Sequence, residues 1–538
     1  MTGRDMRWWG WGEDSHAGNP PEHAISWLER RLGGPLGPPR EVVALQDVRV
    51  APPRLRPATA GALAAIVGEA EVRSDHATRV LRAAGRGYPD LVRLRAGDGD
   101  PAPDAVVAPA DHAQVIAVLA VCAEQGIAVV PFGGGTSVVG GVEPLAGAFE
   151  AVITLDLGRM SKLSDLDERS RLATFEPGLR GPEVETALRR RGYTLGHFPQ
   201  SFEYATVGGW VATRSAGQAS TGYGRIDELV DGLTLAAPAG EMNLLTRPAS
   251  AAGPDLRELV VGSEGALGVL TSVTLRVRPS PETCRYEGWM LPSFQAGVEA
   301  FRELEQSGAA PDVARLSDEY ETSMSLALAG LGGVKARVAG GYMRARGVSG
   351  GALAIVGWEG EEQRVSGRRR ASVDVLRRHG AASLGSTPGR SWAKGRFHAP
   401  YLRDDLLGRG VMVETLETAT TWSNLDHLYA AVGAALGRHA PFVACHISHL
   451  YPSGASLYFT FMAPQESADA IGQWRRVKRE ACDAIVAAGG TITHHHAIGR
   501  DHAQHLTAEA TPLGLGALRA VKATLDPAGI MNPGKLLV

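Results

Sequence analysis

The stretch IAVVPFGGGTSVVGG, residues 127–141, decides the fold of this chain. Its first six residues are apolar and typical of a buried strand, and three glycines follow directly. Glycines expose successive backbone N–H groups and let a ligand approach closely, so the loop at 131–137 suits a phosphate. A tight turn is the alternative. The loop is neither a Rossmann fingerprint, because G-x-G-x-x-G opening a helix is missing, nor a Walker loop.

The residues before this stretch complete a strand–helix–strand unit. AVVAP (105–109) predicts a short buried strand. Asp111 and Gln114 have the spacing of a capping box, which favours a helix start. Gly126 is typical of a helix end, immediately before the strand at 127–132. We therefore expect α/β order from about residue 105.

Two further glycine loops follow the first one. They lie at 206–209 and 262–268, the second directly before a predicted strand at 269–279. Between them, LVDGLTLAAPAGEMNLL (229–245) predicts a hairpin. Three such loops can cradle one extended ligand along its length, and a dinucleotide has that shape.

Composition narrows the class of protein. The chain has 538 residues, 44% of them hydrophobic and 21% charged, so it can bury a large core. The net charge of −3 lacks the basic excess that is typical of nucleic-acid-binding proteins. The four cysteines are widely separated and flanked by apolar residues, so we expect buried thiols. Without a secretory signal, a membrane-spanning stretch or a peroxisomal ending, we expect a reducing cytoplasm.

Four motifs together resemble the FAD-binding family of the vanillyl-alcohol-oxidase type. They are PFGGGTSVVGG, YATVGGWVATRSAG, VGSEGALGVLTSVTLRVRP and DPAGIMNPGKL. The resemblance implies an α+β protein: a two-subdomain, PCMH-type FAD-binding fold with an α/β cap domain. It also implies that the cofactor is FAD. The first loop offers Thr136 and Ser137 where some relatives tether the flavin through His or Cys, so we expect noncovalent FAD.

The resemblance carries specific residues and boundaries. The positions that match the family's FAD contacts are Pro131, Phe132, Gly133, Gly134, Gly135, Thr136, Ser137, Gln200, Ser201, Phe202, Glu203, Tyr204, Ala205, Thr206, Thr213, Arg214, Ser215, Ala216, Glu264, Gly265, Ala266, Leu267, Gly268, Val269 and Leu270. We expect an N-terminal helical or irregular region (1–100), the FAD-binding domain (101–281), the cap or substrate domain (282–440) and a C-terminal segment that returns to the flavin (441–538).

Further segments resemble the alkyldihydroxyacetonephosphate synthases, FAD enzymes of ether lipid synthesis. They are WWGWG (8–12), VARLSD (313–318), YLRD (401–404), ETLETATTW (414–422), ASLYFTF (455–461) and THHHAIG (493–499). The resemblance implies that the flavin bonds to C1 of acyl-dihydroxyacetone phosphate. A long-chain alcohol then replaces the fatty acid, with no net oxidation. The substrate is a lipid-like phosphorylated molecule.

The same resemblance assigns roles to particular side chains. Tyr458 would shuttle the C1 proton, Arg403 would contact the substrate, and Arg315 would be needed for activity. His494, His495 and His496 would lie near the flavin. The chemistry of the residues agrees, since a Tyr–His cluster can act as acid and base and Arg suits a phosphate. Core packing of Tyr458 and an ordinary ion pair of Arg403 remain the alternatives.

The histidines also raise the question of a metal. Residues 494–496 are expected on a strand, where His494 and His496 share a side and His495 faces away. Flavin-dependent 2-hydroxy-acid dehydrogenases of the same fold bind a metal through histidines and a glutamate. Here Tyr458 and His495 occupy two of those positions, so we predict no metal. Because the IMNPGK tail is closer to the dehydrogenases, that activity remains the alternative, and a noncatalytic flavin-binding scaffold is a second one.

The sequence contains few signals for partners other than the substrate. Lipid substrates lead us to expect peripheral membrane contact, for which GRRRASVDVLRRHG (367–380) is the best candidate. A solvated helix is the other interpretation of that segment. The oligomeric state, a homodimer included, stays open.

Overall fold

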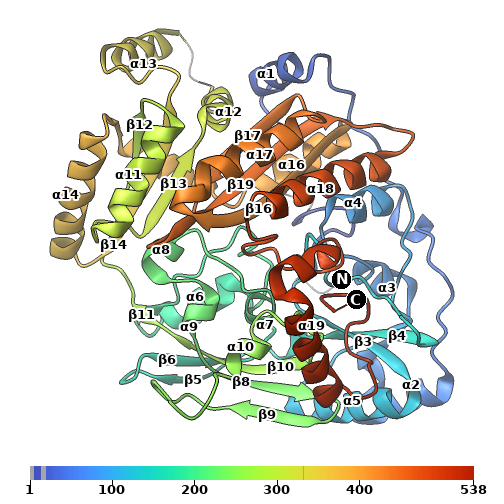
Figure 1. Cartoon of the computed structure of the whole chain (residues 1–538). Helices are drawn as coiled ribbons and strands as arrows, with labels where there is room; N and C mark the ends of the chain where they lie inside the picture. The colour runs from blue at the N-terminus through green and yellow to red at the C-terminus, as the bar shows by residue number, and fades with distance from the viewer. Residues whose placement is uncertain (1–4, 14–19, 331–332, 538) are drawn as a thin grey trace.

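The computed structural model describes residues 5–13, 20–330 and 333–537. Its helices and sheets confirm the α+β class, with one large sheet in the upper half of Figure 1 and smaller sheets below it. The chain passes from the smaller sheets to the large sheet and then returns through a long C-terminal helix, α19 (Leu506–Leu525).

The first sheet carries the first glycine loop. Its order is β1-β2-β4-β3, with β1 Val72–Arg73, β2 Ala105–Val107, β3 Ile127–Phe132 and β4 Ala151–Asp156. Strand β4 runs parallel to β2 and β3, and helix α5 (His112–Gln125) connects β2 to β3. The Asp111 carboxylate accepts a hydrogen bond from the Gln114 N–H, and Gly126 ends the helix with φ 64°. The predicted strand–helix–strand unit is therefore confirmed.

The second sheet lies beside the first and is antiparallel. Its order is β5-β6-β10-β8-β9, with β5 Leu163–Asp167, β6 Leu172–Phe175, β8 Val230–Ala237, β9 Gly240–Leu244 and β10 Val269–Arg276. Strands β8 and β9 form the predicted hairpin. The short helices that complete this part are α6 Gly181–Arg189, α7 Val207–Ala212, α8 Ser220–Tyr223, α9 Ile226–Leu229 and α10 Arg257–Val260; β7 Tyr193–Thr194 pairs with β11 Arg278–Pro279.

The large sheet has the order β15-β12-β14-β13-β17-β19-β16, and β18 pairs with β19. Its strands are β12 Thr283–Leu291, β13 Val313–Ser317, β14 Ala352–Gly360, β15 Ala382–Gly385, β16 Val411–Thr421, β17 Phe442–Ile447, β18 Leu450–Tyr451 and β19 Gly454–Pro464. The sheet thus includes strands on both sides of residue 440, where the sequence analysis places a boundary. Apolar side chains from α11 (Phe294–Gln306), α14 (Glu362–Arg378), α17 (Leu425–Gly437) and α18 (Ala470–Ala487) form one core with it.

Eight α-helices of the described chain have not yet been named. They are α1 Glu22–Leu32, α2 Pro57–Val67, α3 His76–Leu81, α4 Tyr88–Arg95, α12 Glu319–Ala329, α13 Gly333–Ala345, α15 Ser386–Gly395 and α16 Ala399–Gly408. In the described part of the chain, no helix combines the length and hydropathy needed to cross a membrane. Cys122, Cys445 and Cys482 are buried as expected, but Cys284 is exposed, which corrects that expectation for one thiol.

The C-terminal residues close the edge of the first sheet. The Val129 N–H donates to the Ile530 carbonyl at 2.9 Å, and the Asn532 N–H donates to the Val129 carbonyl at 2.8 Å. Lys535 is 1% exposed, and its ammonium group donates to the Glu143 carbonyl. The last residues therefore add to β3, the strand that leads into the first glycine loop.

Candidate active site

The first two glycine loops lie in direct contact. A Cβ at Gly133 would stand 2.3 Å from Thr206 Oγ1, and one at Gly134 would stand 2.0 Å from the Tyr204 carbonyl oxygen. Such distances leave no room for a side chain, so two successive glycines are required at this approach. The predicted contacts at 131–137 and 200–206 are therefore neighbours in space.

The third loop joins the glycine loops to the histidines. Glu264 has φ 54°, and its carboxylate accepts hydrogen bonds from the N–H groups of Ile498 (2.8 Å) and Gly499 (2.6 Å). Burial raises the pKa of Glu264 to about 7 against the lowering effect of these bonds. The third loop thereby holds the end of the segment that carries the three histidines.

A cavity of about 630 Å³ lies between these parts. It is lined by the predicted FAD contacts Thr213, Arg214 and Glu264 and, on the opposite chain segments, by His494 and His495. This volume is in the range of cofactor sites. Gly262 and Glu264 of the third glycine loop line the cavity, whereas 131–137 and 200–206 do not. A bound FAD would take its contacts from 131–137, 200–206, 213–216 and 264–270, and these contacts stay a prediction.

Tyr458 lies on the large sheet beside the histidines. It stands opposite Glu417 of β16 and His446 of β17 in the strand registers. Its ring is stacked on His446 with the centroids 4.8 Å apart, and the rings of His496 and His495 lie at 5.6 Å and 6.0 Å. Burial raises the pKa of Tyr458 to about 12, so the hydroxyl holds its proton at neutral pH. The predicted Tyr–His cluster is present.

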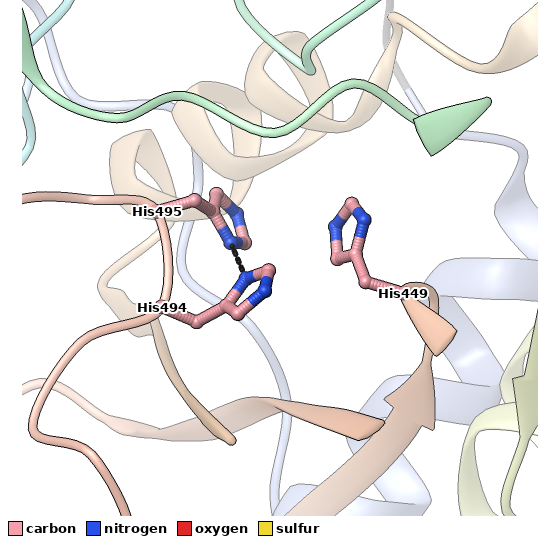
Figure 2. Close-up of side chains that lie close together, drawn as sticks. All are labelled: His449, His494 and His495. Carbon is pink, nitrogen blue, oxygen red and sulfur yellow. Dashed lines mark hydrogen bonds between the residues drawn. The ribbon is translucent and has the colours of Figure 1, made fainter. Parts of the chain in front are cut away.

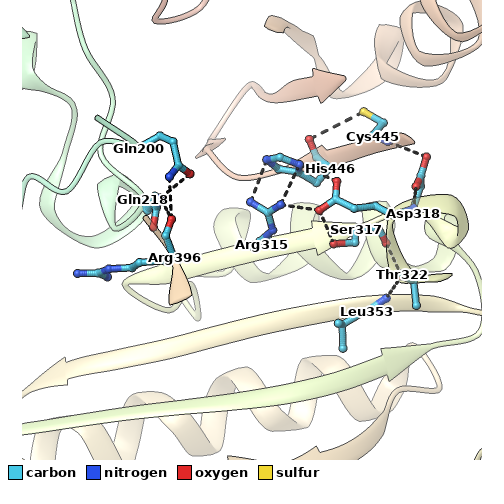
Figure 3. A network of polar contacts seen from close by, with 11 residues as sticks. Gln200, Gln218, Arg315, Ser317, Asp318, Thr322, Leu353, Arg396, Cys445 and His446 are labelled. Atoms are coloured by element: carbon cyan, nitrogen blue, oxygen red, sulfur yellow. Dashed lines mark hydrogen bonds and ion pairs between the residues drawn. The ribbon is translucent and has the colours of Figure 1, made fainter. Parts of the chain in front are cut away.

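Arg315 belongs to a buried network beneath that tyrosine. Its Nη1 donates to His446 Nε2 at 3.0 Å, and its Nη2 donates to Glu321 Oε1 at 2.5 Å. Glu321 Oε2 lies 2.8 Å from His446 Nδ1 (Figure 3, where the side chains of Arg315 and His446 face each other). Although burial opposes it, His446 and Arg315 hold the pKa of Glu321 well below its usual range. Burial and Arg315 lower the pKa of His446.

The backbone at 494–496 is a loop, so the predicted strand is wrong. The physical reason is Glu417, a side chain 2% exposed. Its carboxylate accepts hydrogen bonds from the backbone N–H groups of His494, His495 and His496 and from the Thr493 hydroxyl. In a strand, successive N–H groups point to opposite sides, so they could not converge on one carboxylate. Burial raises the pKa of Glu417, but the nearby histidine rings and these hydrogen bonds lower it to about 2.

Because of this loop, His495 shares a site with His494, contrary to the expectation from a strand. Their Nδ1 atoms are 2.9 Å apart, and His449 faces them across a gap (Figure 2). One ring nitrogen from each of the three lies within 4.8 Å of the others, a spacing that could hold a metal ion. Burial, together with the charge of Arg225, lowers the pKa of His494 and His495, and the same charge would repel a cation. The absence of a metal stays a prediction.

Arg403 is placed apart from this cluster. It lies on α16, donates to the Asp404 carboxylate through Nη2 (3.0 Å) and to the Arg86 carbonyl through Nη1 (2.7 Å). Within the described ranges, no hydrogen bond or ring contact joins it to Tyr458 or the histidines. Sequence reasoning assigned no role to Glu417, Glu321, His446 or His449. Glu417 lies in the quoted segment 414–422, so the segment carried the signal but its position alone did not assign a role.

Comparison with known proteins identifies two domains. Residues 103–245 match the family described as "FAD binding domain", and residues 280–536 match "FAD linked oxidases, C-terminal domain". Together they span the first two glycine loops, Arg315, Tyr458 and the histidine loop at 494–496, while the third glycine loop (262–268) lies between them. FAD is therefore the cofactor of this fold, in agreement with the cavity and the glycine contacts.

Several similar proteins carry the same enzyme name. The chain is 34% identical to the alkyldihydroxyacetonephosphate synthase of Trypanosoma brucei brucei, over 91% of this chain and 82% of that protein. It is 32% identical to the enzyme of that name from Dictyostelium discoideum, over 92% and 83%. A solved alkyldihydroxyacetonephosphate synthase structure matches with a TM-score of 0.85 and 29% identity, over 98% of each chain. The chain therefore belongs to the alkyldihydroxyacetonephosphate synthase family of FAD-dependent enzymes.

Proposed function

We propose that this enzyme exchanges the acyl group of acyl-dihydroxyacetone phosphate for a long-chain alcohol, a step of ether lipid synthesis. The bond between C1 and the acyl oxygen breaks, and the fatty acid leaves as its carboxylate. The alcohol loses its hydroxyl proton to solvent as its oxygen bonds to C1. Because one ester-linked group is replaced by one ether-linked group, no electron acceptor is needed. The observation that carries the proposal is Tyr458 stacked on His446 and surrounded by His495 and His496.

Tyr458 and the imidazoles supply the proton transfers. Burial raises the pKa of Tyr458 to about 12 and lowers that of His496 to about 3, so both side chains are neutral at pH 7. A neutral phenol is a donor and a neutral imidazole is an acceptor. We propose that the C1 proton moves to Tyr458 as its hydroxyl proton moves to a neighbouring imidazole, and that it returns after the exchange.

The other side chains of the site would bind the substrate or orient the proton-transfer groups. Arg403 would hold the substrate phosphate, for which the planar guanidinium is suited. Arg315 and Glu321 keep the His446 ring under Tyr458 through charged hydrogen bonds. FAD, held by the glycine loops, would supply an electrophilic centre that activates C1. Arg403 as substrate ligand and the peripheral membrane contact of this enzyme remain proposals.

The FAD is proposed to be held without a covalent bond, because the loop at 131–137 contains neither His nor Cys. Acid precipitation of the purified enzyme should release yellow FAD into the supernatant. Flavin that stays in the washed pellet would contradict this proposal.

The exchange is tested by supplying acyl-dihydroxyacetone phosphate and a long-chain alcohol to the purified holoenzyme. Fatty acid and the alkyl product should form in equal amounts, without oxygen uptake and without reduction of a dye. If instead a 2-hydroxy acid bleaches the flavin and electrons pass to the dye, the enzyme is a dehydrogenase and the proposal is wrong.

A further inference from the structure

The N-terminal segment Arg7–Gly12 is buried although it forms neither a helix nor a strand. Arg7 is 4% exposed and Trp11 is 3% exposed. The segment folds back on itself, with the Arg7 N–H donating to the Gly12 carbonyl at 2.7 Å. Its neighbours come from two distant parts of the chain: Trp11 packs edge-on against Tyr204, just before the second glycine loop, and Gly12 packs on Tyr401 of α16.

One carboxylate joins this segment to Arg403. Asp404 Oδ2 accepts from the Trp11 N–H (2.5 Å) and from Arg7 Nη2 (3.3 Å). Asp404 Oδ1 accepts from Arg403 Nη2 (3.0 Å) and Nε (3.3 Å). The carboxylate is 1% exposed, so water does not compete for it. One oxygen faces the N-terminal segment and the other faces Arg403.

A second set of hydrogen bonds connects the N-terminal segment to the Arg403 guanidinium through Arg86. Arg403 Nη1 donates to the Arg86 carbonyl, while the Arg86 side chain donates to the carbonyls of Gly10 (3.0 Å) and Arg7 (3.2 Å). The Arg86 N–H in turn donates to the Ser137 carbonyl at 2.6 Å, in the first glycine loop. Among the described residues, the hydrogen bonds of the Arg403 side chain therefore end on Asp404 and Arg86, and both residues bind the N-terminal segment through other atoms.

The glycine at position 10 is a requirement of this contact. A Cβ there would lie 2.5 Å from Asp404 Oδ2 and 2.7 Å from Arg7 Nε. Both atoms belong to side chains that are buried and already hydrogen-bonded, so neither can move aside cheaply.

We infer that the segment Arg7–Gly12 is a positioning element of the active site, which sets the orientation of the Arg403 guanidinium through Asp404 and Arg86. The inference rests on the proposed role of Arg403 as the substrate ligand. It gives the N-terminal Trp-Gly-Trp-Gly motif a function beyond packing, because the motif would affect substrate binding although it lies outside the two ranges, 103–245 and 280–536, that match known families.

The test is a double-mutant cycle with Gly10→Ala and Arg403→Lys, measured on the full-length holoenzyme. Gly10→Ala should raise the KM for acyl-dihydroxyacetone phosphate by about tenfold, because a guanidinium displaced by a fraction of an ångström binds its substrate group poorly. The KM for the alcohol and the FAD content should not change. In the Arg403→Lys background, Gly10→Ala should cause no further rise, because the group that it displaces is gone.

Gly34→Ala is the matched control, since a Cβ at Gly34 would meet no atom within 4 Å. If Gly10→Ala does not fold, Asp404→Asn takes its place in the cycle, as it removes the shared charge without adding volume. A rise by the same factor in both backgrounds, or no rise in either, would overturn the inference.

The wild-type enzyme separates this test from the proposed function. If it does not exchange acyl-dihydroxyacetone phosphate but oxidises a 2-hydroxy acid, the proposed function fails and the same cycle is measured on that acid, whose carboxylate would face Arg403. If Gly10→Ala raises the KM for that acid only when Arg403 is present, the positioning role is supported. If it raises the KM by the same factor in the Arg403→Lys background, the positioning role is wrong.

Discussion

The two halves of the candidate active site are built in different ways. Tyr458, His446 and Arg315 lie on neighbouring strands of one sheet, so backbone pairing fixes their spacing before any side chain interacts. The histidine loop has no such pairing and takes its shape from two buried carboxylates, Glu417 at its start and Glu264 at its end. The sheet half should therefore tolerate side-chain changes structurally, while the loop half depends on individual charges.

The largest effect is expected from Tyr458→Phe. The ring and its stacking on His446 remain, but the hydroxyl that carries the proton is lost. Exchange should fall by about 10²–10⁴-fold, the usual contribution of a positioned acid or base. Flavin absorbance and the circular dichroism spectrum should match the wild type, because the sheet supplies the geometry. Activity within a few-fold of wild type would return Tyr458 to a packing role.

Glu417→Gln should come next and should behave differently. The amide keeps the volume but has one acceptor oxygen instead of two and no charge, so the N–H groups of the histidine loop lose part of their anchor. We expect both a loss of exchange of about a hundredfold and a lower melting temperature. Glu414→Gln is the matched control: Glu414 is buried on the same strand but accepts from Trp474 rather than from the loop. Equal losses in the two variants would contradict the special role of Glu417.

Glu321→Gln tests the sheet half in the same way. Its charge holds Arg315 and His446, but the strand register keeps the His446 backbone beside Tyr458. Exchange should therefore fall only by about tenfold, near the energy of one charge-assisted hydrogen bond. Glu287→Gln, which breaks an ion pair with Arg369 elsewhere on the large sheet, serves as the control. A loss from Glu321→Gln as large as that from Glu417→Gln would remove the distinction between the two halves.

The last prediction concerns stability in acid rather than the rate of exchange. The folded-state pKa of Glu417, about 2, lies below its ordinary value of 4.5. The stability that this carboxylate contributes is thus fully present above pH 4.5 and is lost as the pH falls towards 2, a contribution on the order of 3 kcal/mol. Urea unfolding at a series of pH values should show this loss in the wild type and not in Glu417→Gln. If the free energy of unfolding changed with pH in the same way in the wild type and in Glu417→Gln, the charge of Glu417 would not be coupled to folding.

The sequence predicted the parts that local patterns encode. The strand at 127–132, its capped helix and the glycine loops follow from apolar periodicity, cap residues and glycines that are close neighbours along the chain. The histidine loop could not be predicted in this way. Its backbone is shaped by Glu417, which lies 77 residues before His494, and a short polar run is compatible with a strand until that contact is known.

The network beneath Tyr458 has the same explanation. His446 and Arg315 are 131 residues apart and meet only because β13 pairs with β17. No spacing rule links a histidine and an arginine at that separation. Family resemblance located Arg315, Tyr458 and the three histidines, but it named neither Glu321 nor Glu417, which hold them.

The pairing of residues 530–532 with β3 has a consequence for biosynthesis. A chain is made from its N-terminus, so β3 and the first glycine loop leave the ribosome long before the residues that cover the open edge of that strand. Ribosome-bound chains stalled after residue 525 should consequently retain FAD more weakly than released chains, as flavin fluorescence would measure. A nascent chain must therefore keep the edge of its first sheet from pairing wrongly until residues 530–532 have been made.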